Sequence, residues 1–532
     1  MRQGPGARGP GPVALVALLI SVAPVVAQET DTVVRRDTTL AGPEGTRPRS
    51  LTPDSLNPDS LRPALPYFGA PPGPQPAGRR TVFSGDDIKW TGAMSLGELL
   101  MHVPGAWAVR AGWFGTPEMI SYAGQGSASI EIYWDGFLLQ HVGADSLGFD
   151  TGQFDIGMFE RIEVEVLPTI LRVYLISDTP RERRPRTEVS FSTGDASTNA
   201  YRIRYMNRYA GGFGIALGVT YFGTEGPRTS PGEVTGLGLW GKATYTPSSR
   251  SGVEYQMFRA GRERAALSAT RPGFTGDIAG LDGSRTDHFL RAFASTEEHG
   301  MGWRMDAVFG ATSYSDSSGL LDTGRTQASL EGSFRRRHLS ASLLGRLRDS
   351  GDPLEMVARG SMSPLPFLTV TAAVRRRGAE AGGYGLLDTD LGASFTPMPW
   401  LYGRATMRWR RQGDSAVTGV DTVQRAADWS VGGGVRWRML ELDAGLGRHE
   451  PFDAPPFGHF PGLLVSNTRS GATTLEVSYR FTPIRPVTFS GWWRHQLEDS
   501  LVAFEPLHQA VNRLTFRSMF LPTFRRGAFD FM

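Results

Sequence analysis

Residues 187–532 alternate between apolar and small or polar side chains with a period of two. Over 213–221 every odd position is apolar, whereas the even positions hold Gly, Ala or Thr. The segments 429–437 and 475–481 repeat the pattern. Segments of about ten residues with one lipid-compatible face, repeated many times, are typical of transmembrane β-barrels. We therefore predict an all-β transmembrane barrel, antiparallel and of about 18–22 strands; a soluble all-β protein is the alternative.

Four hydroxyl–proline pairs mark short connections in this region. Outer-membrane barrels have short periplasmic turns and longer outer loops. Placing all four pairs on the periplasmic side leaves an even number of strands in each interval, as antiparallel pairing requires. The longer connections 260–284, 412–428 and 449–471 then fall on the outer side. The four pairs are Thr246-Pro247, Ser363-Pro364, Thr396-Pro397 and Thr482-Pro483.

Residues 81–180 follow a different pattern. Ser84 precedes Asp87, and Ser95 precedes Glu98, by the three positions of a helix capping box. Leu96, Leu99, Leu100 and Val103 then form one apolar helix face, which Pro104-Gly105 ends. Strand-like runs cover 107–110, 119–122, 130–134 and 162–166, and Asp135-Gly136 is a hairpin turn signal. The pattern predicts a compact α/β domain.

This domain resembles the plug domain of TonB-dependent outer-membrane receptors. The resemblance rests on Ser95–Leu100 with Val103-Pro104-Gly105, on Ile130–Trp134 with Asp135-Gly136, and on Phe159-Glu160-Arg161-Ile162-Glu163-Val164. It implies a plugged barrel in the outer membrane of a Gram-negative bacterium. After Val164 the family has an Arg-Gly-Pro and glycine-rich segment, whereas 165–171 here keep only Pro168. The end of the plug is therefore expected to be rebuilt, which puts the usual plug movement in doubt.

The N-terminal region is predicted to hold an export signal followed by a linker. Residues 1–27 are predicted to be a secretory signal peptide, with Arg2 and Arg8 before the apolar run 13–26. Residues 28–80 are rich in proline and are predicted to be a disordered tether. Within it, Asp31-Thr32-Val33-Val34 is similar to the family's TonB box, a β-prone segment that pairs with TonB by strand addition.

The barrel holds about 18 full strands, with a nineteenth expected to start near Phe524. The family's barrels have 22 strands. We expect that the sequence stops about three strands early; an intact end with 18 strands is the alternative.

The charges divide the chain. Residues 81–180 carry a net charge of −9 and residues 181–532 a net charge of +9. Several inward strand positions hold arginine, which either attracts an anionic substrate or holds the acidic domain; we favour the second interpretation. The lumen-facing arginines on which this interpretation depends are Arg404, Arg408, Arg436, Arg480 and Arg494.

Enzymatic chemistry has little support in the sequence. The chain has no cysteine and only two lysines, and its nine histidines are scattered without metal-ligand spacing. An outer loop with His449, Glu450, Asp453 and His459 could bind a metal, although such loops are more often simply polar. The arginines follow strand periodicity instead of forming a patch, which argues against nucleic-acid binding. We predict no catalytic residue, no cofactor and no resident metal.

The resemblance implies a receptor that binds a scarce ligand outside the cell and imports it with energy from the TonB complex of the inner membrane. The ligand class is siderophore, haem, cobalamin, glycan or peptide, and the sequence selects none of them. The expected partners are TonB, outer-membrane lipid and a small ligand. The alternative is a divergent plugged barrel that acts as a non-transporting surface receptor or structural protein. A passive porin is disfavoured because porins carry no α/β domain before the barrel.

Overall fold

The computed structural model describes several segments of the chain between residues 77 and 531. The predicted signal peptide, the tether up to residue 76 and the expected nineteenth strand near Phe524 lie outside these segments. The described segments are 77–110, 118–123, 129–142, 149–181, 184–226, 233–265, 267–271, 274–278, 280–297, 301–319, 322–349, 354–378, 385–414, 422–452, 471–484, 487–497, 506–516, 518–519 and 530–531.

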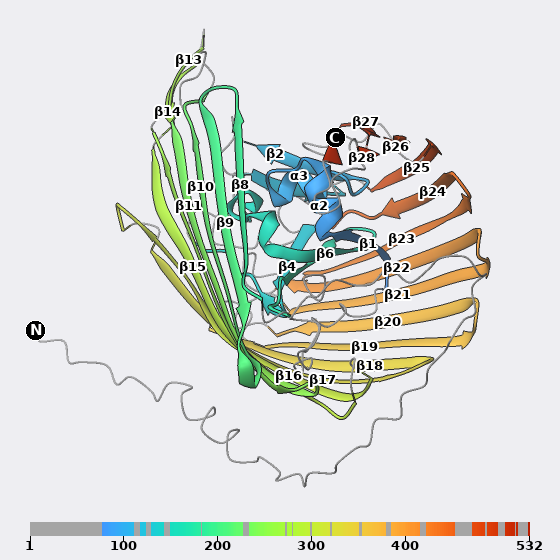
Figure 1. The fold of residues 1–532 in the computed structure, drawn as a ribbon. Coiled ribbons are helices and arrows are strands. Elements are labelled where there is room, and N and C mark those ends of the chain that lie inside the picture. Colours follow the sequence, from blue (N-terminus) through green and yellow to red (C-terminus); the bar gives the residue numbers. More distant parts are fainter. Residues whose placement is uncertain are drawn as a thin grey trace, which may run out of the picture. The chain divides into compact units, whose positions relative to one another are not determined.

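Eighteen antiparallel strands form a barrel wall, as predicted (Figure 1). Each strand pairs with the next in chain order. The strands are β8 (Arg186–Gly194), β9 (Thr198–Arg208), β10 (Phe213–Thr224), β11 (Val234–Ser248), β12 (Ser251–Arg264), β15 (Leu281–Ser295), β16 (Gly302–Asp316), β17 (Thr323–Arg336), β18 (Leu339–Arg348), β19 (Leu354–Leu365), β20 (Leu368–Arg377), β21 (Gly385–Met398), β22 (Leu401–Asp414), β23 (Thr422–Trp437), β24 (Leu440–His449), β25 (Ala472–Ile484), β26 (Val487–Gln496) and β27 (His508–Phe516).

The wall has one seam, between its first and last strands. The strand order is cyclic and returns from β27 to β8. The 17 sequential neighbours each share a paired register of residues. Among the described residues no such register joins β27 to β8, and Figure 1 shows a gap at this position. The two strands are therefore neighbours without a full hydrogen-bonded ladder.

The period-two pattern sorts the side chains as predicted. In β10 the apolar odd positions Leu217, Val219 and Tyr221 are 50%, 42% and 41% exposed on the outside, whereas Ala216 is fully buried. Successive strand residues point to opposite faces, so one face meets the surroundings and the other meets the interior. The outward apolar band is what a barrel needs in lipid.

The four hydroxyl–proline pairs all lie at one end of the wall, here called the turn end. The pairs occur in the β11–β12, β19–β20, β21–β22 and β25–β26 hairpins, and each hairpin has a register shift beside its proline. Proline cannot donate to a ladder, so it is tolerated where a bulge interrupts the pairing. The predicted even spacing of these turns is confirmed. The opposite end is called the loop end.

One predicted outer connection lies at the expected end of the wall but has shorter bounds. Residues 260–284 are largely strand: β12 continues to Arg264, β15 begins at Leu281, and a separate hairpin of β13 (Leu267–Arg271) and β14 (Phe274–Ile278) lies between them. The Pro272-Gly273 dipeptide is a turn signal that sequence reasoning overlooked.

A small α/β unit, the inner domain, lies inside the wall (Figure 1). Its five-stranded sheet has the order β1-β6-β7-β4-β5, in which β4 and β7 are parallel. Its elements are β1 (Arg79–Ser84), α2 (Gly85–Thr91), α3 (Leu96–Leu100), β2 (Ala106–Arg110), β3 (Glu118–Tyr122), β4 (Ile130–Trp134), β5 (Phe137–Leu138), η5 (Thr151–Gln153), η6 (Ile156–Met158), β6 (Phe159–Val166) and β7 (Leu171–Ser177). Outside this domain, the 3-10 turn η7 (Ala210–Gly212) joins β9 to β10, and β28 (Ser518–Met519) pairs with β29 (Asp530–Phe531) after the last wall strand.

The apolar core continues from the inner domain into the wall. Trp134 is fully buried, with its ring centroid 5.4 Å from that of Phe159 in the inner domain and 5.3 Å from that of Phe258 on β12. Edge-on aromatic contacts of this kind stabilise beyond their buried area. Within the described residues, no helix has the length and apolar character needed to cross a membrane.

Candidate functional site

The first candidate motif forms the start of α3. The hydroxyl of Ser95 accepts from the backbone N–H of Glu98 at 3.1 Å, as the capping-box spacing predicts. The Glu98 carboxylate accepts from the N–H of Met94 at 2.8 Å, one residue earlier than the box requires. The predicted apolar face is confirmed, because Leu96, Leu99, Leu100 and Val103 are all fully buried.

Pro104-Gly105 ends this segment and touches the wall. Gly105 has a φ of +81°, a left-handed conformation that favours glycine. Its carbonyl accepts from Arg494 of β26 at 3.2 Å, and the indole of Trp492 donates to Met101 at 3.0 Å. The turn is therefore one anchor of the inner domain on the wall.

We expect the Gly105→Ala variant to lose about 1–2 kcal/mol of stability, because a left-handed backbone costs this much for a residue with a Cβ atom. The new Cβ would also lie 2.2 Å from Arg494 Nη1, so the arginine must move. Thermal unfolding of the purified variant measures the effect. An unchanged unfolding temperature would contradict it.

Asp135-Gly136 forms the predicted turn between β4 and β5, with φ values of +44° and +93°. Asp135 is buried and accepts from the backbone N–H of Ser177 at 3.2 Å and from its hydroxyl. It also accepts from Gln256 on β12 at 2.6 Å, and Lys242 of β11 lies 3.7 Å away. The turn is therefore a second anchor, joining β7, β11 and β12.

The Glu160, Arg161 and Glu163 motif remains within the inner domain. On β6, Arg161 pairs with Glu163 at 2.7 Å and with Glu160 at 3.5 Å. Glu163 also pairs with Arg80 of the neighbouring strand β1. These residues join the edge strand β1 to the sheet, and Glu160 also pairs with Arg181 in the segment between β7 and β8.

The segment that departs from the family pattern is a tight hairpin. Leu167 N–H donates to Ile170 at 3.0 Å, which lets β7 fold back along β6. Thr169 at its tip donates to Asp428 of β23 at 3.2 Å. Arg172 follows the turn and is only 1% exposed, so the rebuilt segment places a charge in the centre of the molecule.

A buried charge cluster joins the inner domain to the wall at this point. Glu131 of β4 pairs with Arg375 and Arg377 of β20 and lies 3.4 Å from Arg172. Arg172 in turn pairs with Asp390 of β21 at 2.9 Å. Sequence reasoning missed this cluster. The alternation of the strand places residues 375 and 377 on its inward face, which the sequence could have shown. It does not reveal which carboxylate faces them.

Burial and the neighbouring guanidiniums act in opposite directions on the pKa of Glu131. Burial raises the pKa, but Arg375, Arg377 and Arg172 outweigh it and hold the pKa well below its ordinary value. The pKa of Glu165 is also below its ordinary value. Burial raises this pKa, but the charges of Arg172 and Arg359 and the hydrogen bond from the Ala77 N–H together outweigh burial. Both groups are therefore carboxylates at neutral pH.

We expect the inner domain to stay attached on mild acidification. A folded-state pKa below the unfolded value gives stability that is present above the unfolded pKa and is lost as pH falls through the folded pKa. Limited proteolysis should therefore show the same resistance at pH 7 and pH 5, with loss only below about pH 4, under the ordinary carboxyl range. Release of the domain near pH 6 would contradict this account.

Three of the five predicted lumen arginines pair with carboxylates of the wall itself. Arg404 donates to Asp443, and Arg436 pairs with Glu441 at 2.8 Å. Arg408 lies 3.0 Å from Asp388 of β21.

The other two differ. Arg494 is buried against the inner domain at Gly105, whereas Arg480 is exposed near the turn end.

Other basic residues of the wall hold the acidic inner domain. Arg262 pairs with Asp150 at 2.7 Å, Arg202 pairs with Asp155, and Arg204 lies 3.8 Å from Asp178. Two contacts reverse the expected signs: besides the Arg172–Asp390 pair, Arg79 of the inner domain pairs with Glu476 of β25 at 2.7 Å.

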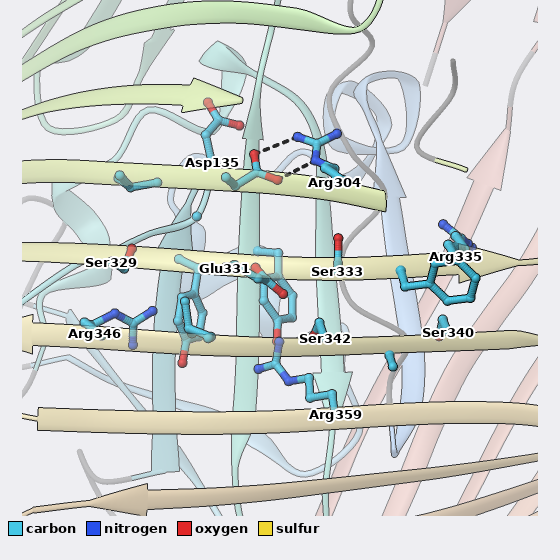
Figure 2. A pocket seen from close by; sticks show the side chains of 18 of the residues that line it. Asp135, Arg304, Ser329, Glu331, Ser333, Arg335, Ser340, Ser342, Arg346 and Arg359 are labelled. Atoms are coloured by element: carbon cyan, nitrogen blue, oxygen red, sulfur yellow. Dashed lines mark hydrogen bonds and ion pairs between the residues drawn. The ribbon is translucent and has the colours of Figure 1, made fainter. Parts of the chain in front are cut away.

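Two larger cavities lie between the inner domain and the wall, both in the half near the turn end. One, of about 920 Å³, lies between α2 and strands β8 and β9. The other, of about 190 Å³, lies against β16–β19 and has serine, arginine and glutamate side chains on its wall side (Figure 2). A third, of about 60 Å³, lies beside Arg404 and Arg494.

The described residues hold no group of three metal-ligating side chains. Glu450 accepts from the Ala427 N–H at 2.7 Å, so its carboxylate is engaged with β23. Asp453 and His459 lie outside the described residues, as does the candidate TonB box 31–34.

The geometry defines a class: a β-barrel whose lumen holds an α/β domain fixed by ion pairs. Residues 75–166 match the family model described as TonB-dependent Receptor Plug Domain. The match ends at Val166, where the sequence departs from the family pattern. The inner domain is therefore a plug domain of the TonB-dependent receptor type, and the chain as a whole has the plugged-barrel fold.

Solved structures of the same fold include three siderophore or iron-complex proteins. The ferric enterobactin receptor of Pseudomonas aeruginosa is 11% identical, with a TM-score of 0.62 over 83% of this chain and 84% of that chain. The ferric yersiniabactin uptake receptor of Yersinia pestis is 10% identical, with a TM-score of 0.60 over 83% and 84%. The ferric citrate transporter FecA is 15% identical, with a TM-score of 0.56 over 83% and 82%. No curated protein matches this sequence.

Proposed function

We propose that this protein is a TonB-dependent receptor of the Gram-negative outer membrane, which binds a scarce ligand outside the cell and imports it with energy supplied by TonB. The observation that carries the proposal is a family-matched plug held inside an 18-strand wall. In this account the turn end faces the periplasm and the loop end faces outside. The apolar outward band contacts lipid.

The ligand belongs to the siderophore, haem, cobalamin, glycan or peptide classes. The similar structures bind or transport ferric siderophores and ferric citrate, and at 9–15% identity their ligands do not transfer. The second candidate is a plugged barrel that no longer transports. The rebuilt hairpin at 167–170 favours it, because Thr169 bonds the plug to β23 at a point where the family has a glycine-rich segment.

Conductance separates a plugged receptor from an open pore. We expect the full chain, reconstituted in a planar bilayer, to be nearly silent, because the plug fills the lumen and is bonded to the wall on several sides. Steady large currents through the folded protein would contradict the proposal and would indicate a porin.

A further inference from the structure

We propose that hydrophilic solute passes the plug along β16–β19, through the smaller of the two large cavities. This inference rests on the proposed function. A row of four wall residues crosses these strands, each opposite the next in the strand register. Arg304 lies opposite Ser333, Ser333 opposite Ser342, and Ser342 opposite Arg359. All four line the cavity of about 190 Å³, which has room for about six waters at ~30 Å³ each.

The cavity is built for water and polar solute. Ser329, Ser333, Ser340 and Ser342 all point into it (Figure 2), and a serine hydroxyl both donates and accepts. None of these four hydroxyls bonds to the plug among the described residues. Within the part of the chain that the structure describes, the one side-chain hydrogen bond of the group joins Ser340 to Ser361 at 3.2 Å. The plug therefore leaves this part of the wall uncovered.

Arg359 is one of the charges that face the cavity, and the charges of Glu165 and Glu331 act on it. In the described part of the chain it has no hydrogen bond and no ion pair, unlike Arg304, which pairs with Asp306, and Arg346, which pairs with Glu355. Glu331 faces the same cavity, likewise without an ion pair. A guanidinium with free donors beside serine hydroxyls fits a solute that presents carboxylate or hydroxyl oxygens.

Between the Glu131 and Asp135 anchors, β17 and β18 hold the plug by weak contacts, although Tyr133 also accepts from Arg375 of β20 at 3.0 Å. Gln327 donates to the Leu138 carbonyl at 2.7 Å, and the Arg346 guanidinium lies 5.5 Å from the Tyr133 ring centroid. The larger cavity beside β8 and β9 ends instead at the Arg202–Asp155 pair, which makes two charge-assisted hydrogen bonds. Charge-assisted bonds are about twice as strong as neutral ones. Partial displacement of the plug therefore opens the β16–β19 side first.

The test uses bilayer currents of the full chain, which has no native cysteine. Three single-cysteine variants are compared: Ser342→Cys at the proposed passage, Ser190→Cys at the larger cavity, and Ala373→Cys as a matched control. Ala373 is two strands from Ser342 in the same row and also points inward, but it is 7% exposed beneath the plug. Urea is raised to the lowest concentration that gives openings, and a charged, hydrophilic methanethiosulfonate is then added.

We expect the reagent to remove most of the urea-induced current in Ser342→Cys and to leave the current unchanged in the other two variants. Block at Ser190→Cys or Ala373→Cys, with none at Ser342→Cys, would overturn the inference while leaving the receptor function standing. The absence of openings at any urea concentration that preserves the wall would overturn it as well. A large current that does not depend on urea would instead contradict the proposed function.

Ion selectivity gives a second measurement that needs no reagent. Arg359→Gln should lower the preference of the urea-induced current for chloride over potassium, because it removes an unpaired charge from the passage. Arg436→Gln removes a charge that is paired with Glu441 and lies away from the cavity, and should leave the preference unchanged. Equal effects of the two variants would contradict the assignment.

Discussion

The Glu131→Gln variant is expected to release the plug from its wall. Glu131 is 5% exposed and its carboxylate faces Arg375, Arg377 and Arg172. Removing one partner of a buried ion pair leaves uncompensated charge, which costs about 3–5 kcal/mol. Because the three arginines belong to both the plug and the wall, the loss falls on the contact between them. The bilayer current of the purified variant should rise well above that of the wild type.

Glu355→Gln is the matched control. Glu355 is fully buried and faces the same Arg375 and Arg377, at 3.2 and 3.9 Å, but it lies on β19 of the wall. Its loss should lower the unfolding temperature without opening the pore. Equal currents in the two variants would show that the cluster serves wall stability alone.

The second large effect is expected at the Asp135 turn. Asp135→Asn keeps a residue that tolerates the left-handed φ, so the turn itself survives. It removes the negative charge near Lys242, which is 2% exposed and lies 3.7 Å away. Lys242 would keep only Glu254, at 3.9 Å. The loss of its nearer partner is expected to cost about 3 kcal/mol, measured as a fall in the apparent free energy of unfolding.

A double variant tests the cause. Replacing both members of a buried pair is often nearly neutral, so Asp135→Asn with Lys242→Met should recover more than half of the loss. The lysine also donates to Ser177 and Thr179, at 2.9 and 3.0 Å, and methionine cannot make these bonds, so part of the loss remains. A double variant no more stable than the single one would mean that the turn acts through its hydrogen bonds and not through charge.

Local patterns predicted much of the fold. The strand period in 213–221 determines which face of β10 is outward, and the hydroxyl–proline pairs determine which strand ends meet, because both depend on neighbours in the chain. The helix face of Leu96, Leu99 and Leu100 and the Asp135-Gly136 turn are local in the same sense. The bounds of the 260–284 connection were too wide because the ends of β12 and β15 and the short strands β13 and β14 look like a polar loop.

The contacts of the site could not be predicted in this way. Arg375 and Arg404 both occupy inward-facing strand positions. Arg375 pairs with Glu131 of the plug, however, whereas Arg404 pairs with Asp443 of the wall. The difference depends on the depth and rotation of the plug in the barrel, which no local pattern encodes. Net charge predicted only part of these contacts. Wall arginines do pair with plug carboxylates, but the Arg172–Asp390 and Arg79–Glu476 pairs place plug cations on wall carboxylates, against the sign of the totals.

Coupling to TonB is the central claim, and disulfide trapping tests it most directly. The chain has no cysteine, so Val33→Cys provides a single thiol in the proposed TonB box, and Gln75→Cys provides a control in the same tether. Each variant is expressed with a cysteine-bearing C-terminal domain of TonB. We predict a cross-link at residue 33 and none at residue 75, with the protein in the outer membrane. No cross-link at any position from Asp31 to Val34 would contradict the account and would favour a barrel that no longer transports.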